Sequence, residues 1–384
     1  MGASIGDENG PRVGKVIPRT LIKSNGCSTV SADLRTIELS LLDSPDPEIV
    51  SKLVQTTKAA IKEDGFLFLT NYGVSLEQLH RQFDLAQYLH SNISEEDKER
   101  LHWDPSTGVF AGFKPRYGWK REPGKLDGIE QFNFYSPEFA DYSRVPNCIL
   151  PFMDEITAFC DYLMNSVNRR LLRLLSMVLE LPDDYLWENV QSHNGLVGDG
   201  YFRHALFYPL EGENKVARKV PITALQIWSD NRWKYVKYDP GALVINLGET
   251  LEGGHFKATL HKVLFGSLTF QVAEPPLDQQ HEQRLSLVFF NGSTGEMRLR
   301  PFTGSPSCLL TIREGFVEKQ GVFMQFKRLM DAGIPVPTNK EWREAQISTR
   351  SQVPPEEKLG GVKEINGIKY GEDIILGVPV LLPA

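Results

Sequence analysis

The chain has 384 residues, of which 41% are hydrophobic, so it can bury the core of one large domain or of two ordinary ones. Its 42 basic and 49 acidic residues give a net charge of −7 and are mixed along the sequence, so neither a nucleic-acid partner nor a membrane surface is indicated. The cysteines form no C-x-x-C pair, which argues against a zinc knuckle and against a disulfide framework.

The first segment, residues 1–30, is expected to be flexible. It has no apolar run of the length found in a signal peptide, and no run elsewhere is long enough to span a membrane. We therefore expect a cytoplasmic protein that binds small molecules or other proteins.

Residues 31–185 are predicted to form a helical region. Asp46 and Pro47 are typical of an N-cap and a first helical residue, and Gly65 is expected to end the helix that they begin. The run that follows, GFLFLTNYGV over 65–74, is short, aromatic and bounded by glycines, which predicts a buried strand.

Two more helices are predicted in the same region. Ser75 and Gln78 match a capping box ahead of a second amphipathic helix. Apolar residues then recur at helical spacing from about Pro151 to Val178, which predicts a third and longest helix. We expect these helices to form one layer of the fold.

Residues 186–304 change to short β-rich runs separated by Gly, Pro, Asp and Asn. The runs are YFRHALFY, ITALQIW, WKYVKY, ALVINL, FKATLHKV and RLSLVFF. Many short strands with such punctuation indicate a sandwich or jelly roll rather than a parallel βαβ sheet. Residues 305–384, rich in Pro and Lys with weak periodicity, are expected to form a C-terminal extension that serves as a peripheral tail or lid.

The order of these segments resembles that of a known family. GFLFLTNYGV, FYP over 207–209, ALQI followed by Trp233, PGALVINLGETLE, KATLHKV and RLSLVFF are similar, in this order, to segments of iron- and 2-oxoglutarate-dependent dioxygenases of the isopenicillin N synthase type. The likeness covers residues 35 to 300. Trp342-Arg343 and INGIKYGEDIILGV are similar to filamentous-fungal members of secondary metabolism. The resemblance implies an α+β fold with a double-stranded β-helix (jelly roll) core and an N-terminal helical layer.

The resemblance also implies an active site. Members bind Fe(II) with two histidines and one carboxylate, and they use 2-oxoglutarate as cosubstrate to hydroxylate, desaturate or cyclise a small molecule. By position, His261 would ligate iron, while Arg284, Ser286 and Tyr208 would bind 2-oxoglutarate. Arg284 and Ser286 alternate along one strand face, and a guanidinium grips a carboxylate in a bidentate way.

The remaining iron ligands of the family form an H-x-D pair between Tyr208-Pro209 and Leu225. Here the connector, residues 210–223, contains neither histidine nor aspartate. His102 and Asp104 form a literal H-x-D far upstream, and His204 precedes Tyr208 on the same strand face. These three residues are the substitutes that the sequence offers.

The short connector leaves two hypotheses open. One is an active oxidoreductase of small-molecule metabolism; the other is a catalytically impaired homologue, or the product of a mis-spliced gene model, that binds a small molecule or a partner oxygenase. Asp127 and Glu130 could line a substrate entrance or lie in a solvated turn.

Overall fold

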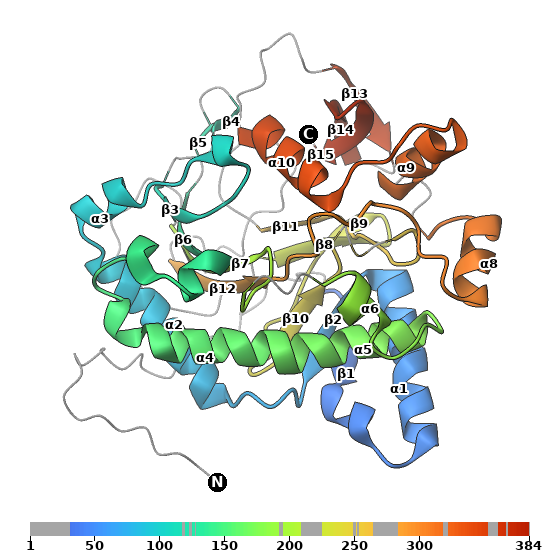
Figure 1. The fold of residues 1–384 in the computed structure, drawn as a ribbon, viewed down its shortest axis with the longest axis horizontal. Helices are drawn as coiled ribbons and strands as arrows, with labels where there is room; N and C mark the ends of the chain where they lie inside the picture. The colour runs from blue at the N-terminus through green and yellow to red at the C-terminus, as the bar shows by residue number, and fades with distance from the viewer. Residues whose placement is uncertain are drawn as a thin grey trace.

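The computed structural model describes residues 31–116, 120–122, 125–126, 128–191, 195–208, 225–248, 251, 253–263, 283–317, 322–351, 360–365 and 368–383. The protein is an α+β fold in which strands lie between a helical layer and the C-terminal segment, as Figure 1 shows. The predicted flexible segment 1–30 and the short connector 210–223 lie outside the described residues.

The first predicted helix and strand are confirmed. Helix α1 (Pro47–Ala59) begins after Asp46, whose side chain accepts a hydrogen bond from the backbone of Glu48. A π-helical turn continues it and ends at Gly65, where a φ of 64° suits glycine. Strand β2 (Phe66–Thr70) follows directly and is almost fully buried.

The other two predicted helices are also confirmed. Helix α2 (Leu76–Asn92) begins with both hydrogen bonds of the capping box between Ser75 and Gln78. The longest helix covers the sheets on one side (Figure 1) and consists of α4 (Met153–Tyr162), the π-helical segment η7 (Leu163–Asn168) and α5 (Arg169–Val178). The shorter α-helices of this half are α3 (Glu95–Arg100) and α6 (Tyr185–Asn189).

The main sheet is antiparallel and joins strands from both halves of the chain. Its order is β12 (Arg284–Phe290), β7 (Tyr201–Phe207), β6 (Ile129–Tyr135) and β3 (Gly112–Lys114). Strands β3 and β6 lie in the stretch for which the sequence predicted mainly helices. They are strands because IEQFNFY alternates aromatic with polar residues, so that each kind occupies one face.

The two faces of the main sheet differ in polarity. One face packs against α2 and α4 through aromatic residues such as Phe132, Phe134 and Phe202. Strand register places a second set on the opposite face, which we call the arginine face; it includes Lys114, Gln131, Asn133, Arg203, Ala205, Arg284 and Ser286, beside apolar and aromatic residues such as Tyr201, Phe207 and Phe290. No carboxylate lies on this face among the residues that the strands β3, β6, β7 and β12 contribute.

Three smaller sheets are built from the other strands of the first 300 residues. β1 (Thr36–Glu38), β2 and β10 (Leu243–Asn246) form one sheet, and β11 (His261–Val263), β8 (Leu225–Ser229) and β9 (Arg232–Tyr235) form another. β4 (Lys120–Glu122) and β5 (Lys125–Leu126) form a two-stranded ribbon. Each of the β-rich runs predicted after Tyr201 therefore contains a strand, although the strand can be shorter than the run, as in FKATLHKV.

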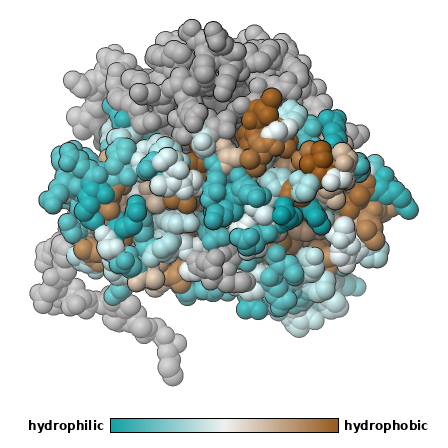
Figure 2. Space-filling model, turned by 45° about the horizontal axis from the view of Figure 1, so that its top comes forward, coloured by the Kyte–Doolittle hydropathy of each residue, from teal (hydrophilic) through white to brown (hydrophobic). Residues whose placement is uncertain are grey.

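The C-terminal segment is more regular than its composition indicates. It contains α8 (Pro306–Glu314), α9 (Val322–Asp331), α10 (Asn339–Ser351), β13 (Gly360–Ile365), β14 (Ile368–Ile375) and β15 (Val378–Pro383). It has a hydrophobic cluster of its own, made of Leu299, Phe316, Phe323, Phe326, Val336, Trp342, Ile375 and Val378. Figure 2 shows a mainly polar surface with hydrophobic residues gathered in a few patches. None of the described helices has the length and hydrophobicity to cross a bilayer.

Candidate active site

Arg284 begins strand β12 and lies opposite Phe207 on the arginine face. Its guanidinium carbon is 4.0 Å from the centroid of the Phe207 ring. Its Nη2 is buried without a hydrogen-bond partner. Burial lowers the pKa of Arg284 to about 10, so the group stays charged at neutral pH. A buried cation with an unused donor destabilises the protein unless a ligand supplies the counter-charge, and a carboxylate would do so.

Polar side chains follow Arg284 along the same face of the sheet. Ser286 follows it by two residues and lies opposite Ala205. Gln131 and Asn133 on β6 are buried, and the Nε2 of the first and the Nδ2 of the second have no hydrogen-bond partner. The sequence interpretation missed both amides, although the alternation in IEQFNFY could have indicated them. Every unpaired atom among these side chains is a donor, so the face suits a ligand rich in acceptors.

His261 lies on β11, opposite Ile227 of β8. Its Nδ1 is 3.0 Å from the carbonyl oxygen of Thr259, which favours the tautomer with the proton on Nδ1 and the lone pair on Nε2. Nε2 is 3.5 Å from Asn246 Nδ2, and the ring meets Phe66 edge-on at 5.4 Å. This tautomer is the one that a metal-ligating histidine adopts.

Tyr208 and Arg284 are not brought together. The Tyr208 hydroxyl donates to Glu130 Oε2 at 3.4 Å, and Glu130 lies on the sheet face opposite to Arg284. The other carboxylate oxygen, Oε1, is 2.9 Å from His90 Nδ1. Glu130 is therefore in a strand with a side chain only 12% exposed, and the solvated turn considered for it is wrong. Asp127 lies outside the described residues.

His204 faces the helical layer rather than a polar cavity. Its ring lies 5.0 Å from that of Phe134 and 4.9 Å from that of Phe202, both edge-on. It is fully buried and neither ring nitrogen has a hydrogen-bond partner. Burial, together with His90, lowers the pKa of His204 to about 3. The imidazole is neutral, and among the described residues it belongs to no group of three side chains that could hold a metal.

His102 and Asp104 have local roles. Asp104 caps a short 3-10 helix by accepting from Ser106 N at 2.9 Å, and these hydrogen bonds hold its pKa below the usual range. His102 Nδ1 is 2.9 Å from the carbonyl oxygen of Trp103. Across the described part of the chain, no three His, Cys, Asp or Glu side chains converge on a point where a metal could bind.

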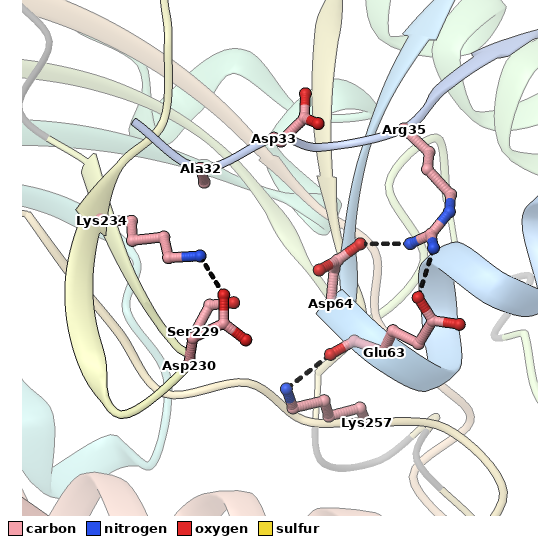
Figure 3. Close-up of a pocket in the computed structure, with 9 residues that line it drawn as sticks. All are labelled: Ala32, Asp33, Arg35, Glu63, Asp64, Ser229, Asp230, Lys234 and Lys257. Carbon is pink, nitrogen blue, oxygen red and sulfur yellow. Dashed lines mark hydrogen bonds and ion pairs between the residues drawn. The ribbon is translucent and has the colours of Figure 1, made fainter. Parts of the chain in front are cut away.

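A charged cavity of about 470 Å³ lies near the loop that leads to β11, and Figure 3 shows its lining. Its basic groups are already occupied: Arg35 pairs with Asp64 and Glu63, and Lys234 pairs with Asp230. Lys257, which also lines the cavity, donates to the Glu63 carbonyl at 2.6 Å. We interpret this cavity as a surface cleft between ion pairs.

The described residues fit one of the two groups that the family uses. Arg284 fits the carboxylate of 2-oxoglutarate because its buried donor has no partner. For Fe(II), the described residues supply His261 alone, and one ligand is too few for a stable site. The connector 210–223, where the family has its other ligands, is not among these residues.

Comparison with known proteins supports the resemblance. Residues 34–149 match the family model described as the N-terminal part of non-haem dioxygenases in morphine synthesis. The chain is 23% identical over 304 residues to gibberellin 20 oxidase 3 of Arabidopsis thaliana, covering 71% of this chain and 74% of that one. It is 24% identical over 262 residues to a 2-oxoglutarate-dependent dioxygenase of Gibberella zeae, covering 61% and 74%.

Solved structures share the fold. A full-length Neurospora crassa protein, solved in complex with α-KG and thymine, superposes with a TM-score of 0.61 at 14% identity, over 82% of this chain and 96% of that one. JOX2 in complex with 2OG, Fe and JA gives a TM-score of 0.52 at 18% identity, over 88% and 94%. The N-terminal family model and the relatives, which extend over most of the chain, agree with one another: this protein is similar to 2-oxoglutarate- and Fe(II)-dependent dioxygenases.

Proposed function

We propose that this chain binds 2-oxoglutarate at Arg284 and Ser286 and acts as an oxidoreductase on a small organic molecule. The unpaired, buried Nη2 of Arg284 carries the proposal, because a carboxylate would satisfy both its charge and its free donor. Members of the family couple substrate oxidation to the conversion of 2-oxoglutarate and O2 into succinate and CO2. Hydroxylation, desaturation and ring closure are the outcomes that we consider.

We extend the proposal to the architecture and the metal. The main sheet and the β11-β8-β9 sheet would form the two sides of a double-stranded β-helix, with the arginine face turned inward. His261 would be one iron ligand, since its Nε2 carries the lone pair and has only a long, 3.5 Å contact with Asn246 Nδ2. The fungal relative and the C-terminal likeness support a role in the secondary metabolism of a filamentous fungus.

The cosubstrate site is tested by titrating 2-oxoglutarate into the protein by calorimetry. Arg284→Met should weaken binding about 100-fold, since a bidentate charged contact contributes about 3 kcal/mol. The affinity of Arg284→Lys for 2-oxoglutarate should lie between those of wild type and Arg284→Met, because lysine keeps the charge but cannot make the bidentate contact. Arg81→Gln, which removes a surface pair with Glu155, is the matched control and should bind like wild type.

The same variants separate binding from folding. Arg284→Met removes an unpaired buried charge, so its melting temperature without ligand should equal or exceed that of wild type. Unchanged affinity in Arg284→Met, or its loss together with the folded structure, would overturn the assignment.

A second candidate function is a 2-oxoglutarate-binding homologue that does not turn over, which could serve a partner oxygenase. The observation that favours it is the single ligand, His261, in the described residues. Succinate formation that depends on Fe(II) and is abolished by His261→Ala would exclude this candidate. Sequencing the transcript across codons 210–223 is the simpler test, because an in-frame insert encoding H-x-D would restore the full ligand set.

A further inference from the structure

The arginine face carries more positive charge than 2-oxoglutarate alone can neutralise. Arg203 lies on it four residues before Phe207, the partner of Arg284, which separates the two backbones by about 13 Å along the sheet. This distance exceeds the length of 2-oxoglutarate. The third cation, Lys114, donates to the carbonyl oxygens of Pro115 and Ile129. A 2-oxoglutarate molecule bound at Arg284 therefore leaves the positive charge of Arg203 without a counter-charge.

Neutral groups hold the Arg203 guanidinium in place. Nε donates to Asn133 Oδ1 at 2.8 Å, and Nη2 donates to the Tyr201 hydroxyl at 3.3 Å. The guanidinium carbon lies 5.0 Å from the ring centroids of Tyr201 and Phe290 and 6.0 Å from that of Phe110. No carboxylate contacts it in the described part of the chain. Burial lowers its pKa, although an arginine stays protonated at neutral pH.

The neighbouring amide points to the ligand. Asn133 uses its oxygen on Arg203, so its Nδ2 is the free end, and this atom is buried without a partner. Gln131 Nε2, on the same strand face, is unpaired as well. A guanidinium beside two unpaired amide donors matches the two acceptor oxygens of a carboxylate. The rings of Phe110, Tyr201 and Phe290 would meet the apolar part of the same molecule.

We propose that Arg203 and Asn133 bind a carboxylate of the substrate, so that this oxygenase takes an organic acid beside 2-oxoglutarate. The inference rests on the proposed function, because it places the substrate on the same sheet face as the cosubstrate. It deepens that function by assigning a chemical class to the substrate. Arg203 is a recognition residue in this assignment, and Arg284 remains with the cosubstrate.

The test compares acids with neutral isosteres in the presence of saturating 2-oxoglutarate. The probes are benzoate, cinnamate and decanoate, each paired with its primary amide, and binding is measured by calorimetry. Wild type should bind at least one acid about tenfold or more tightly than its amide. Arg203→Gln should bind the two alike, and Arg203→Lys should keep part of the preference because it keeps the charge.

Controls separate this inference from the proposed function. Arg203→Gln and Arg203→Lys should bind 2-oxoglutarate with the affinity of wild type, which also shows that they fold. If wild type binds 2-oxoglutarate but prefers no acid over its amide, or if Arg203→Gln keeps the preference, Arg203 is a structural cation between aromatic rings and the inference is overturned. If wild type does not bind 2-oxoglutarate, the proposed function fails, and this inference fails with it.

Discussion

Buried polar side chains occupy both faces of the main sheet, and their partners differ. On the arginine face the unpaired atoms are donors, which an anionic ligand can satisfy. On the opposite face His204 lies between aromatic rings, where both of its nitrogens lose water and gain nothing in return. The first arrangement suits binding, whereas the second only costs stability.

His204→Phe should therefore stabilise the protein by about 1–3 kcal/mol at neutral pH. The gain should grow as the pH falls. Burial holds the pKa of His204 at about 3, below its usual 6.5, so the unfolded chain takes up a proton that the folded protein does not. Wild-type stability then falls as the pH drops from 6.5 toward 3. Urea unfolding at pH 7 and pH 5 measures this, and an equal difference at both would contradict it.

Glu138→Gln should stabilise the protein at high pH, whereas the gain from His204→Phe grows at low pH. Burial raises the pKa of Glu138 from 4.5 to about 8, so its contribution is present below pH 4.5 and is lost as the pH rises toward 8. The backbone N–H of Tyr135 donates to Glu138 Oε2 at 3.1 Å, and glutamine keeps an oxygen that can accept this hydrogen bond. The variant should be about 1–3 kcal/mol more stable at pH 8 and equal to wild type near pH 4.5.

Glu95→Gln is the matched control for Glu138, because the Glu95 side chain is 85% exposed. Thermal unfolding of both variants between pH 4.5 and pH 8 measures whether the gain in stability is specific to Glu138. A Glu138→Gln protein that follows the wild-type pH profile would show that Glu138 is ionised in the folded state.

Helices and strands are joined by a chain of amides, of which Asn168 and Gln191 are buried. Asn168, at the end of η7, donates to Gln191 Oε1 at 2.9 Å and accepts from Asn291 Nδ2 at 2.9 Å. Gln191 in turn donates to the Gly292 carbonyl at 2.7 Å. Since Asn291 and Gly292 follow β12 directly, this chain fixes the long helix to the strand that carries Arg284.

Asn168→Leu should destabilise the protein by about 2–4 kcal/mol, because it removes the partner that buried Gln191 and the more exposed Asn291 share. Gln191→Leu should cost a similar amount, and the double variant should cost less than the sum of the two. Chemical unfolding of the three variants completes this cycle. Additive losses would mean that the two amides act independently.

Elements with local signals were predictable from the sequence. Helix starts are marked by the caps at Asp46 and Ser75, and a helix end is marked by Gly65, all through contacts within a few residues. Strand β6 was missed although IEQFNFY alternates in the sequence, whereas the C-terminal helices were missed because burial of Trp342 against Phe326 stabilises them through contacts between separate elements. Dependence on distant contacts also limits how much of the candidate site can be predicted from the sequence. His261 and Arg284 follow from motifs, whereas their distance from Asn133 and Arg203 depends on how several sheets assemble.

At the scale of the whole molecule, the C-terminal segment has a hydrophobic cluster separate from those of the rest of the fold. Phe326 is fully buried there, with ring centroids 5.4 Å from Phe323 and 5.1 Å from Trp342. Phe326→Ala should destabilise this segment by about 3–5 kcal/mol. Hydrogen exchange should show faster exchange in β14 and β15 than in β7 and β12, and 2-oxoglutarate binding should persist. Equal loss of protection in all four strands would indicate one cooperative unit.

The interleaving of early and late strands in the main sheet has a consequence for synthesis. Strand β7 pairs with β6 on one side and with β12 on the other, so residues more than 150 positions apart complete one ladder. During synthesis β6 and β7 leave the ribosome long before β12, so the edge of β7 that pairs with β12 stays unpaired until then. The arginine face is thus assembled only near the end of translation. A nascent chain of this protein should need a chaperone through that interval, and slow synthesis after β7 should lower its yield.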